Sequence, residues 1–380
     1  MRRPIQRNEH RLLFDYMDES LKRAKQYSNF KIRLTVIQLV LTVVFLVIVL
    51  FSGTSALLRN VVVTWSRNFY LQVALYLAIF SGIYYVLFAP LDFYDGFVLE
   101  HRFGLSTQTV FGWLKKSLKK AIVSLPILLA VTEALYFLLR NFPNSWWLLI
   151  TAVWLLMTIV LGKIAPVLII PLFYTCRPLP DSELRNKLLE LGKKCSVRIK
   201  NVFEIQFSKE TKKANAAVAG FGRGRRILLG DTLLENYSQD QIEAVFAHEL
   251  GHVRLLHTWR MLGFGATTSL ACFYITYLLF ARSVNLLGFD SIHDIAAFPL
   301  LVMIFVAAGL LLLPIQNGYS RYLEKQADRF ALDHIADSKS FVSAITKLSS
   351  QNLSDPSPHR LVELLLYDHP PIAKRVAYCT

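Results

Sequence analysis

The segment His248-Glu249-Leu250-Gly251-His252 combines the side chains that a hydrolytic metal site needs. Residues four apart share one face of a helix, so this segment predicts a helix that holds the two imidazoles side by side. Histidines at this spacing are typical zinc ligands, and the glutamate between them can take a proton from water. We therefore predict His248 and His252 as ligands of one Zn²⁺ ion, with Glu249 as the general base.

A pair of carboxylates further along the chain can complete this site. Glu324 and Asp328 are again four residues apart on a predicted helix. Glu324 can serve as the third ligand, while Asp328 can accept the spare N–H of a ligating imidazole and so orient it. Two histidines and one glutamate leave a coordination position open, which favours hydrolysis over a structural site closed by four ligands. The alternative interpretation of each motif is a solvated, charged helix face.

The elements that must position these residues can also be predicted. Ser238 and Gln241 form the S-x-x-Q pattern of a capping box, so the helix with the histidines should begin there. Glycines surround Ile227-Leu228-Leu229 and predict a short strand between turns. Peptide hydrolysis also needs an oxyanion stabiliser, for which His369 and Arg375 are candidates. On spacing alone, an ordinary basic tail explains these last two residues equally well.

The composition indicates a membrane protein. Hydrophobic residues make up 54% of the 380 residues and charged residues only 18%, with a mean hydropathy of +0.39. A soluble domain is nearer a quarter charged. Runs of apolar residues long enough to cross a bilayer as helices lie at about 34–51, 69–90, 121–139, 146–170, 260–281 and 296–315. Glu133, inside the third run, should face a bundle interior or a wet cavity, or else lie near the interface at the end of the span.

The net charge of +15 comes from basic segments between the apolar runs. The N-terminal segment, residues 91–120 and residues 175–259 are rich in lysine and arginine, which is typical of cytoplasmic loops. Nucleic acid is therefore not an expected partner, and both termini and the catalytic motifs should be cytoplasmic. Two spans separate His252 from Glu324, so the chain returns to the same membrane face. Four scattered cysteines favour neither a disulfide framework nor a thiolate site, and no cleavable signal is visible.

The fold class that follows is mainly α: a polytopic membrane protein with six spans by hydropathy and a small α+β cytoplasmic domain. The organisation we expect is a cytoplasmic segment at 1–33, a four-span region at 34–174, a metalloprotease domain at 175–259, a transmembrane hairpin at 260–315 and a zinc-ligand helix with the C-terminal segment at 316–380.

These motifs together resemble the M48 zinc metalloproteases. The resemblance rests on H-E-L-G-H, on E-x-x-x-D after a transmembrane hairpin, and on H-P-P-x-x-x-R at 369–375. Residues 213–220 with N-A-x-x-x-G, the D-T-L-L at 231–234, the stretch 100–106 and His257-Thr258 narrow it to the Ste24-type CAAX prenyl proteases. The resemblance implies a zinc endopeptidase that removes the last three residues of prenylated C-a-a-X proteins.

The resemblance also implies structural details. It implies seven spans around a water-filled chamber, one more than hydropathy gives, and the extra one could continue the zinc helix. Asn215 and Ala216 should begin an edge strand that pairs with substrate backbone. His369 and Arg375 match the substrate and transition-state positions of the family.

The sequence departs from the family in ways that bear on the substrate. Ala217-Val218-Ala219 is smaller than the common aromatic version, and the short outer loops indicate a bacterial member in the plasma membrane, or in the endoplasmic reticulum if eukaryotic. A quality-control protease of the HtpX type is an alternative, although that branch is shorter before the zinc helix. A non-catalytic membrane protein or transporter with a structural metal site is another. The lipid bilayer is an expected partner, and the oligomeric state stays open.

Overall fold

The structure, a computed structural model, describes residues 5–199, 202–220 and 226–379. Among the residues outside these ranges are Arg223 and Arg225 of the basic segment 175–259, and Gly222 and Gly224 from the glycines before the predicted strand. The α-helices are α1 (Ile5–Phe51), α2 (Thr54–Trp65), α3 (Phe69–Phe93), α4 (Leu99–Arg102), α5 (Val110–Asn141), α6 (Trp146–Ile164), α7 (Ile170–Phe173), α8 (Glu183–Lys194), α9 (Asp231–Asn236), α10 (Gln239–Arg254), α11 (His257–Leu286), α12 (Phe298–His334), α13 (Ser338–Gln351), α14 (Arg360–Leu366) and α15 (Ile372–Cys379). The strands are β1 (Cys176–Pro178), β2 (Val202–Ile205), β3 (Ala216–Ala219) and β4 (Arg226–Gly230).

Six helical stretches of the described chain are long and apolar enough to cross a membrane, and they contain the six apolar runs of the sequence. They are α1 from Glu19 onward, α3 continued through α4, α5, α6 continued through α7, α11, and α12 together with the short turn at 295–297 that precedes it. The seventh span that the resemblance implied is not found in residues 5–199, 202–220 and 226–379. The continuation of the zinc helix α10 is α11, which is already the fifth span, and α2 has only 12 residues.

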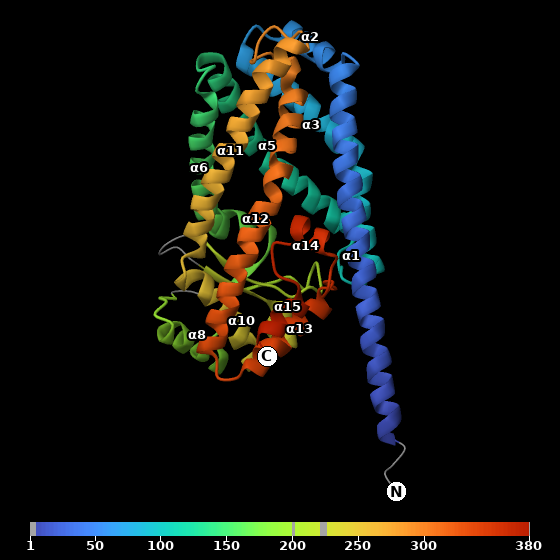
Figure 1. The fold of residues 1–380 in the computed structure, drawn as a ribbon, viewed down its shortest axis with the longest axis vertical. Coiled ribbons are helices and arrows are strands. Elements are labelled where there is room, and N and C mark those ends of the chain that lie inside the picture. Colours follow the sequence, from blue (N-terminus) through green and yellow to red (C-terminus); the bar gives the residue numbers. More distant parts are fainter. Residues whose placement is uncertain (1–4, 200–201, 221–225, 380) are drawn as a thin grey trace.

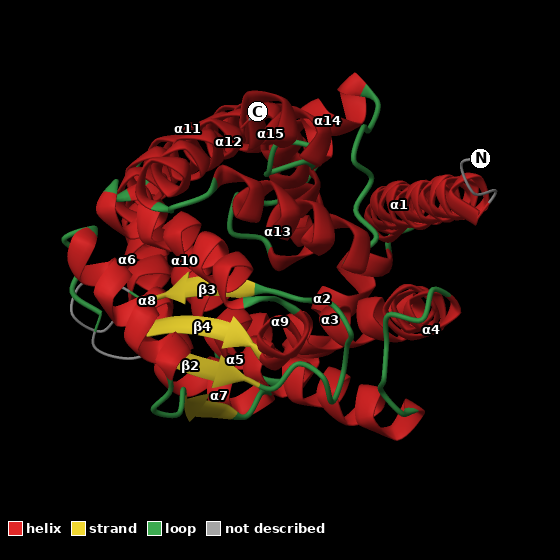
Figure 2. Ribbon diagram, turned by 90° about the horizontal axis from the view of Figure 1, so that it is seen from below, coloured by secondary structure: helices red, strands yellow, loops and turns green. Residues whose placement is uncertain are grey.

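The six spans close into a ring. In order around it, α1 contacts α3, α3 contacts α5, α5 contacts α6, α6 contacts α11, α11 contacts α12, and α12 returns to α1. Figure 2 shows these helices arranged around the sheet domain when the molecule is seen from below. One end of the ring is packed by large buried side chains, among them Tyr76, Tyr136, Trp146 and Phe280. This is the end that carries α2 in Figure 1.

The small sheet lies at the other end of the ring. Its strand order is β1-β2-β4-β3, with β2 parallel to β4 and β3 antiparallel to β4, so β3 is an edge strand. The predicted strand at 227–229 is confirmed as part of β4. Buried side chains from residues 188–250 and from α13 share one core, which includes Leu188, Leu229, Phe246 and Phe341. The C-terminal segment therefore completes the same folded unit as the sheet.

Both chain ends lie at the end of the molecule that carries the sheet (Figure 1). The connections after α1, α5 and α11 lie at the opposite end. The helix α11 leads away from the sheet domain and α12 returns to it, as the even number of predicted spans required. Glu133 lies in α5, and one of its carboxylate oxygens is buried without a hydrogen-bond partner in the described chain.

Candidate metal centre and active site

The helix α10 begins where the sequence predicted. The Ser238 hydroxyl accepts from the Gln241 N–H, and the Gln241 side chain accepts from the Ser238 N–H, so the capping box is present. Ile242, Phe246 and Leu250 are buried in the core beneath the sheet. Their burial fixes the rotation of α10 and leaves His248 and His252 together on the face toward α12.

A glycine allows α10 to approach α12 closely. A Cβ atom built on Gly251 would lie 3.1 Å from the Ala327 Cα and 3.2 Å from the Ala327 carbonyl oxygen. The absence of a side chain at this crossing therefore lets the two backbones meet. Glu324 lies one helical turn before Ala327, and the close crossing brings its carboxylate to the two histidines.

The predicted ligands converge. The Nε2 atoms of His248 and His252 lie 3.2 Å apart, and each is 3.3 Å from one carboxylate oxygen of Glu324. One ligand atom from each residue lies within 4.8 Å of the others. The donor set of two imidazoles and one carboxylate fits a transition metal such as zinc.

Two further observations show that the site is suited to a cation. The Oε2 atom of Glu324 is buried and has no hydrogen-bond partner in the described chain, which a metal ion would remedy. Burial alone would lower the pKa of His248, but Asp328 and Glu324 outweigh burial and raise that pKa to about 10. The same carboxylates that favour a proton on His248 would favour a divalent cation bound to that imidazole in the proton's place.

Asp328 lies behind His248. One of its carboxylate oxygens is 2.8 Å from the His248 Nδ1 atom, so the Nε2 atom is left to face the metal position. Arg375 donates to both oxygens of Asp328, and the Tyr378 hydroxyl donates to one of them. Asp328 is fully buried. The contacts of Arg375 in the structure are thus with Asp328, the partner of a ligand.

The ring of His252 has a hydrogen-bonding partner, His257, that the H-E-x-x-H spacing does not predict. Its Nδ1 atom lies 3.0 Å from the Nδ1 atom of His257, whose Nε2 atom lies 3.2 Å from the Gln326 side-chain oxygen. Arg260 donates to the same oxygen. If the Nε2 atom of His252 faces a metal, its Nδ1–H donates to the Nδ1 atom of His257. The Nε2–H of His257 then donates to the Gln326 oxygen, so each nitrogen in the chain has a suitable partner. The sequence signal was only the resemblance at His257-Thr258, because the contact depends on the turn between α10 and α11.

Glu249 points toward the edge strand. Its Oε2 atom accepts a hydrogen bond of 3.1 Å from the backbone N–H of Val218, in the middle of β3. Burial raises the pKa of Glu249 above its ordinary value, in the direction that a general base near neutral pH requires. The contact also brings the edge strand to the reacting end of the site, which the spacing of H-E-x-x-H cannot reveal.

The remaining predicted residues border the site. The His369 Nε2 atom lies 3.4 Å from the Glu324 Oε2 atom, and its Nδ1 atom is 2.9 Å from Asp368. Asn215 is exposed and immediately precedes β3, whose first residue is Ala216. The structure therefore brings together the ligands, Glu249, Asp328 and His369, and it places Asn215 at the start of the edge strand.

Comparison with known proteins identifies the family. The model of peptidase family M48 matches residues 178–379, which is more than half of the chain. The chain belongs to peptidase family M48. A second family model, described as the CAAX prenyl protease N-terminal region with five membrane helices, matches residues 9–175. The resemblance found in the sequence is thus confirmed over nearly the whole length.

Relatives and a solved structure agree. The uncharacterized metalloprotease YhfN of Bacillus subtilis is 30% identical over 359 residues, covering 93% of this chain and 84% of the relative. The CAAX prenyl protease 1 homolog of Arabidopsis thaliana is 31% identical over 299 residues, covering 76% and 68%. The human CAAX prenyl protease 1 homolog is 27% identical over 331 residues, covering 76% and 69%.

The crystal structure of S. mikatae Ste24p has the same fold, with a TM-score of 0.86 at 24% identity, covering 95% of this chain and 89% of that one. This M48 protein is therefore a multi-pass integral membrane metalloendopeptidase. The alternative of a non-catalytic transporter is removed.

Proposed function

We propose that this M48 protein uses zinc to hydrolyse peptide bonds near the C-terminus of CaaX-type proteins, including prenylated ones. The observation that carries the proposal is the convergence of His248, His252 and Glu324 beside Glu249, which itself contacts an edge strand. The relatives named CAAX prenyl protease 1 homolog, which align with about three quarters of this chain, support the substrate class.

His248, His252 and Glu324 would hold one zinc ion. The ion would supply Lewis acidity, which would make a water more acidic and a carbonyl more electrophilic. Asp328 fixes the tautomer of His248 through the Nδ1 atom, and His257 does the same for His252. The imidazoles are then held with their Nε2 atoms facing each other and the Glu324 carboxylate before substrate arrives.

Glu249 is the proposed general base. It takes the proton of the attacking water and later delivers it to the leaving amine. The Val218 N–H holds one of its carboxylate oxygens, so the other is left for the water. The raised pKa favours protonation of Glu249 during the first step.

The edge strand β3 is the proposed platform for substrate. Its outer edge has no strand partner in the described chain, so a peptide in extended conformation can pair with it as an added strand. Asn215 and Ala216 lie where such a peptide would begin to pair. His369 borders Glu324 and is proposed to donate to the substrate carbonyl. Arg375 binds both oxygens of Asp328, so its role in the transition state is proposed to be indirect, through Asp328 and His248.

We also propose that the sheet domain is cytoplasmic. The basic segments 91–120 and 175–259 and both termini lie at this end of the ring. Cytoplasmic loops carry such an excess of lysine and arginine.

The test is a cleavage assay on detergent-purified protein with a fluorogenic farnesylated C-a-a-X peptide. Wild type is compared with Glu249→Gln, and the zinc content of both is measured. We expect Glu249→Gln to keep one zinc per chain and to lose most of its activity, by roughly 10²–10⁴-fold for loss of a general base. Intact cleavage in Glu249→Gln would show that another group is the base.

The unprenylated form of the same peptide separates the substrate classes. Faster cleavage of the farnesylated peptide supports a CaaX protease. Equal cleavage of both forms rejects prenyl recognition and favours the alternative, a protease of membrane proteins like that of the HtpX branch. If the protein binds zinc but cleaves neither peptide, the CaaX substrate class is rejected, and the assignment of the metal ligands still stands.

A further inference from the structure

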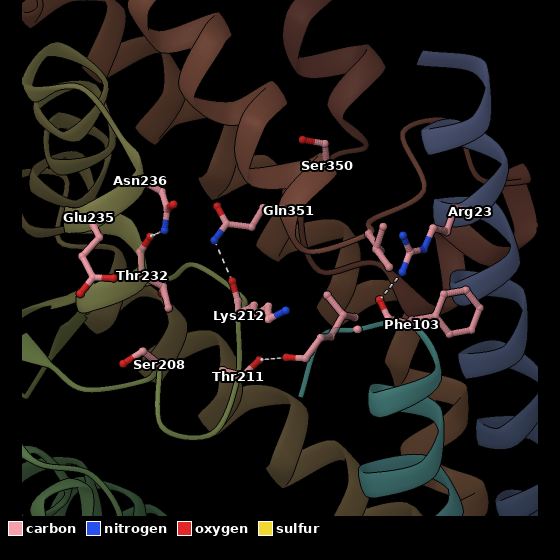
Figure 3. A pocket seen from close by; sticks show the side chains of 13 residues that line it. Arg23, Phe103, Ser208, Thr211, Lys212, Thr232, Glu235, Asn236, Ser350 and Gln351 are labelled. Carbon is pink, nitrogen blue, oxygen red and sulfur yellow. Dashed lines mark hydrogen bonds between the residues drawn. The ribbon is translucent and has the colours of Figure 1, made fainter. Parts of the chain in front are cut away.

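The segment that leads into the edge strand, residues 211–214, is bonded through its backbone to several side chains, and its last residue, Ala214, is also buried in the core of the sheet domain. Thr211 and Lys212 line a cavity of about 610 Å³, so the chain is not packed on that side. Figure 3 shows this cavity, with the Gln351 side chain pointing at the Lys212 carbonyl and the Thr211 hydroxyl pointing at the backbone of Leu105. The position of the segment therefore depends on the groups that bond to its backbone.

Asn352, at the end of α13, makes the most specific of these contacts. Its side-chain oxygen accepts from the Ala214 N–H, and its side-chain nitrogen donates to the Ala214 carbonyl, both at 2.9 Å. An amide is the group that can donate and accept at once in this way. Asn352 thus bonds to the backbone of Ala214 as a neighbouring strand would, two residues before β3 begins.

The backbone around Asn352 is constrained from both directions. Gln351 donates to the Lys212 carbonyl at 2.7 Å, so consecutive residues of α13 hold alternate residues of the lead-in segment. Leu353 has a φ of 51°, a left-handed conformation that is unfavourable for a residue with a side chain. Its side chain is buried in a cluster with Tyr27 and Phe103, which holds this turn in place.

Lys213 anchors the same segment to the membrane helices. Lys213 lies between the two residues that α13 and Asn352 hold, and its side chain contacts α1 and α4 instead. Its ammonium lies 2.8 Å from the Glu100 carboxylate and donates to the Tyr27 hydroxyl, which itself donates to Glu100. Residues 212–214 are thus clamped between α13 on one side and α1 with α4 on the other.

We propose that Asn352 is a positioning residue for substrate: it fixes the edge strand β3, through Ala214, at the place where a peptide pairs with it and where Val218 reaches Glu249. Lys213 is the second anchor of the same clamp. The inference rests on the proposed pairing of substrate with β3. Val218 lies four residues beyond Ala214 in the same stretch of chain and donates to Glu249, so the clamp and the catalytic contact lie on one segment.

The experiment compares wild type with Asn352→Asp and with the control Ser350→Ala. Aspartate keeps the shape but turns a second acceptor toward the Ala214 carbonyl, so one hydrogen bond is replaced by repulsion. Ser350 is exposed, and within the described residues its hydroxyl donates to the carbonyl of Lys347 on the same helix. The substrates are a cleavable peptide and a series of the same peptide with one backbone nitrogen methylated at a time.

We expect wild type to lose activity at the methylated positions that pair with β3. Asn352→Asp should raise KM roughly tenfold, the factor that one lost hydrogen bond typically produces, with kcat much less affected. Cleavage by Asn352→Asp should also be less sensitive to methylation of the peptide backbone, because β3 would no longer be in register with the peptide. Ser350→Ala should match wild type in both respects.

Two results would overturn the proposal. One is an Asn352→Asp enzyme with the KM and methylation pattern of wild type. The other is a raised KM with the full methylation penalty retained, which would indicate a general structural defect. If Asn352→Asp does not fold, Lys213→Met is compared with Lys209→Met, an exposed neighbour, and the same criteria apply.

Failure of the proposed function is recognised separately. If wild type cleaves no peptide, hydrogen exchange of the 211–219 amides still tests the clamp, because it needs no substrate. Asn352→Asp should then exchange faster than Ser350→Ala in this segment, and equal exchange rejects the clamp.

Discussion

At the scale of single residues, Asp328 joins the metal site to the C-terminal helix. It faces His248 with one oxygen, and it accepts from Arg375 and Tyr378 on α15. A buried charge of this kind is stable only because its partners neutralise and hydrogen-bond it. The geometry of the ligand therefore depends on residues near the end of the chain, far from the H-E-x-x-H motif.

Replacing Asp328 by Asn should weaken metal binding. The amide cannot stabilise the His248 N–H as a carboxylate does, and loss of such a partner typically costs 10–100-fold in metal affinity. The substitution also leaves the buried guanidinium of Arg375 without a counter-charge, so the melting temperature should fall. Competition with a zinc chelator measures the affinity, and Asp333→Asn, an exposed change on the same helix, is the control. Unchanged zinc affinity in Asp328→Asn would remove Asp328 from the metal site.

The sequence predicts the parts of the site that lie on one helix face at fixed spacing. His248, Glu249 and His252 follow from helical periodicity, and Glu324 with Asp328 repeats the same argument. The contacts of Glu249 with Val218 and of His252 with His257 do not follow from spacing. They depend on how β3 and α11 pack against α10, which only tertiary structure determines.

At the scale of elements, the site is made by the crossing of α10 and α12. Gly251 lies at this crossing, where a side chain would meet the Ala327 backbone and the Phe330 Cβ atom at 3.1–3.2 Å. Backbone cannot move aside as the end of a flexible side chain can. The separation of the two helices is therefore set by the absence of a Cβ atom at one position.

Gly251→Ala should push α12 away and separate Glu324 from the histidines. Overpacking of this kind typically costs about 1–3 kcal/mol of stability. Zinc affinity and peptide cleavage should fall together, since both need the third ligand. The matched control is Gly263→Ala on α11, where an added Cβ atom meets nothing within 4 Å. Wild-type zinc affinity in Gly251→Ala would show that the crossing tolerates the methyl group.

Hydropathy predicts the spans well but not their order around the ring. The six apolar runs all lie within the six observed stretches. A helix needs about 20 apolar residues to cross the hydrocarbon core, so each span leaves a clear signal in the sequence. The first helix is longer than expected, since α1 continues the first span through the polar residues before it without a break. Ring neighbours such as α6 and α11 could not be inferred, because faces toward lipid and toward other helices are similarly apolar.

At the scale of the whole molecule, topology decides whether the site can form. The helices α11 and α12 separate His252 from Glu324, and they carry the chain away from the sheet domain and back. The basic segments, the sheet and both termini gather at one end of the ring, and the connections after α1, α5 and α11 lie at the other. The basic segments and the catalytic residues thus lie at the same end of the spans, so whichever side of the membrane holds one also holds the other.

This orientation can be measured with single cysteines and a maleimide that does not cross membranes. The background carries Cys176→Ser and Cys379→Ser, because these thiols are half-buried, whereas Cys195 and Cys272 are buried. We expect Asn144→Cys, in the exposed turn between α5 and α6, to react in intact cells. Lys209→Cys, exposed beside the edge-strand segment, should react only after the membrane is opened, because basic segments are retained in the cytoplasm. The reverse pattern would place the metal site outside the cytoplasm and exclude cytoplasmic C-termini as its substrates, whatever peptide the purified enzyme cleaves.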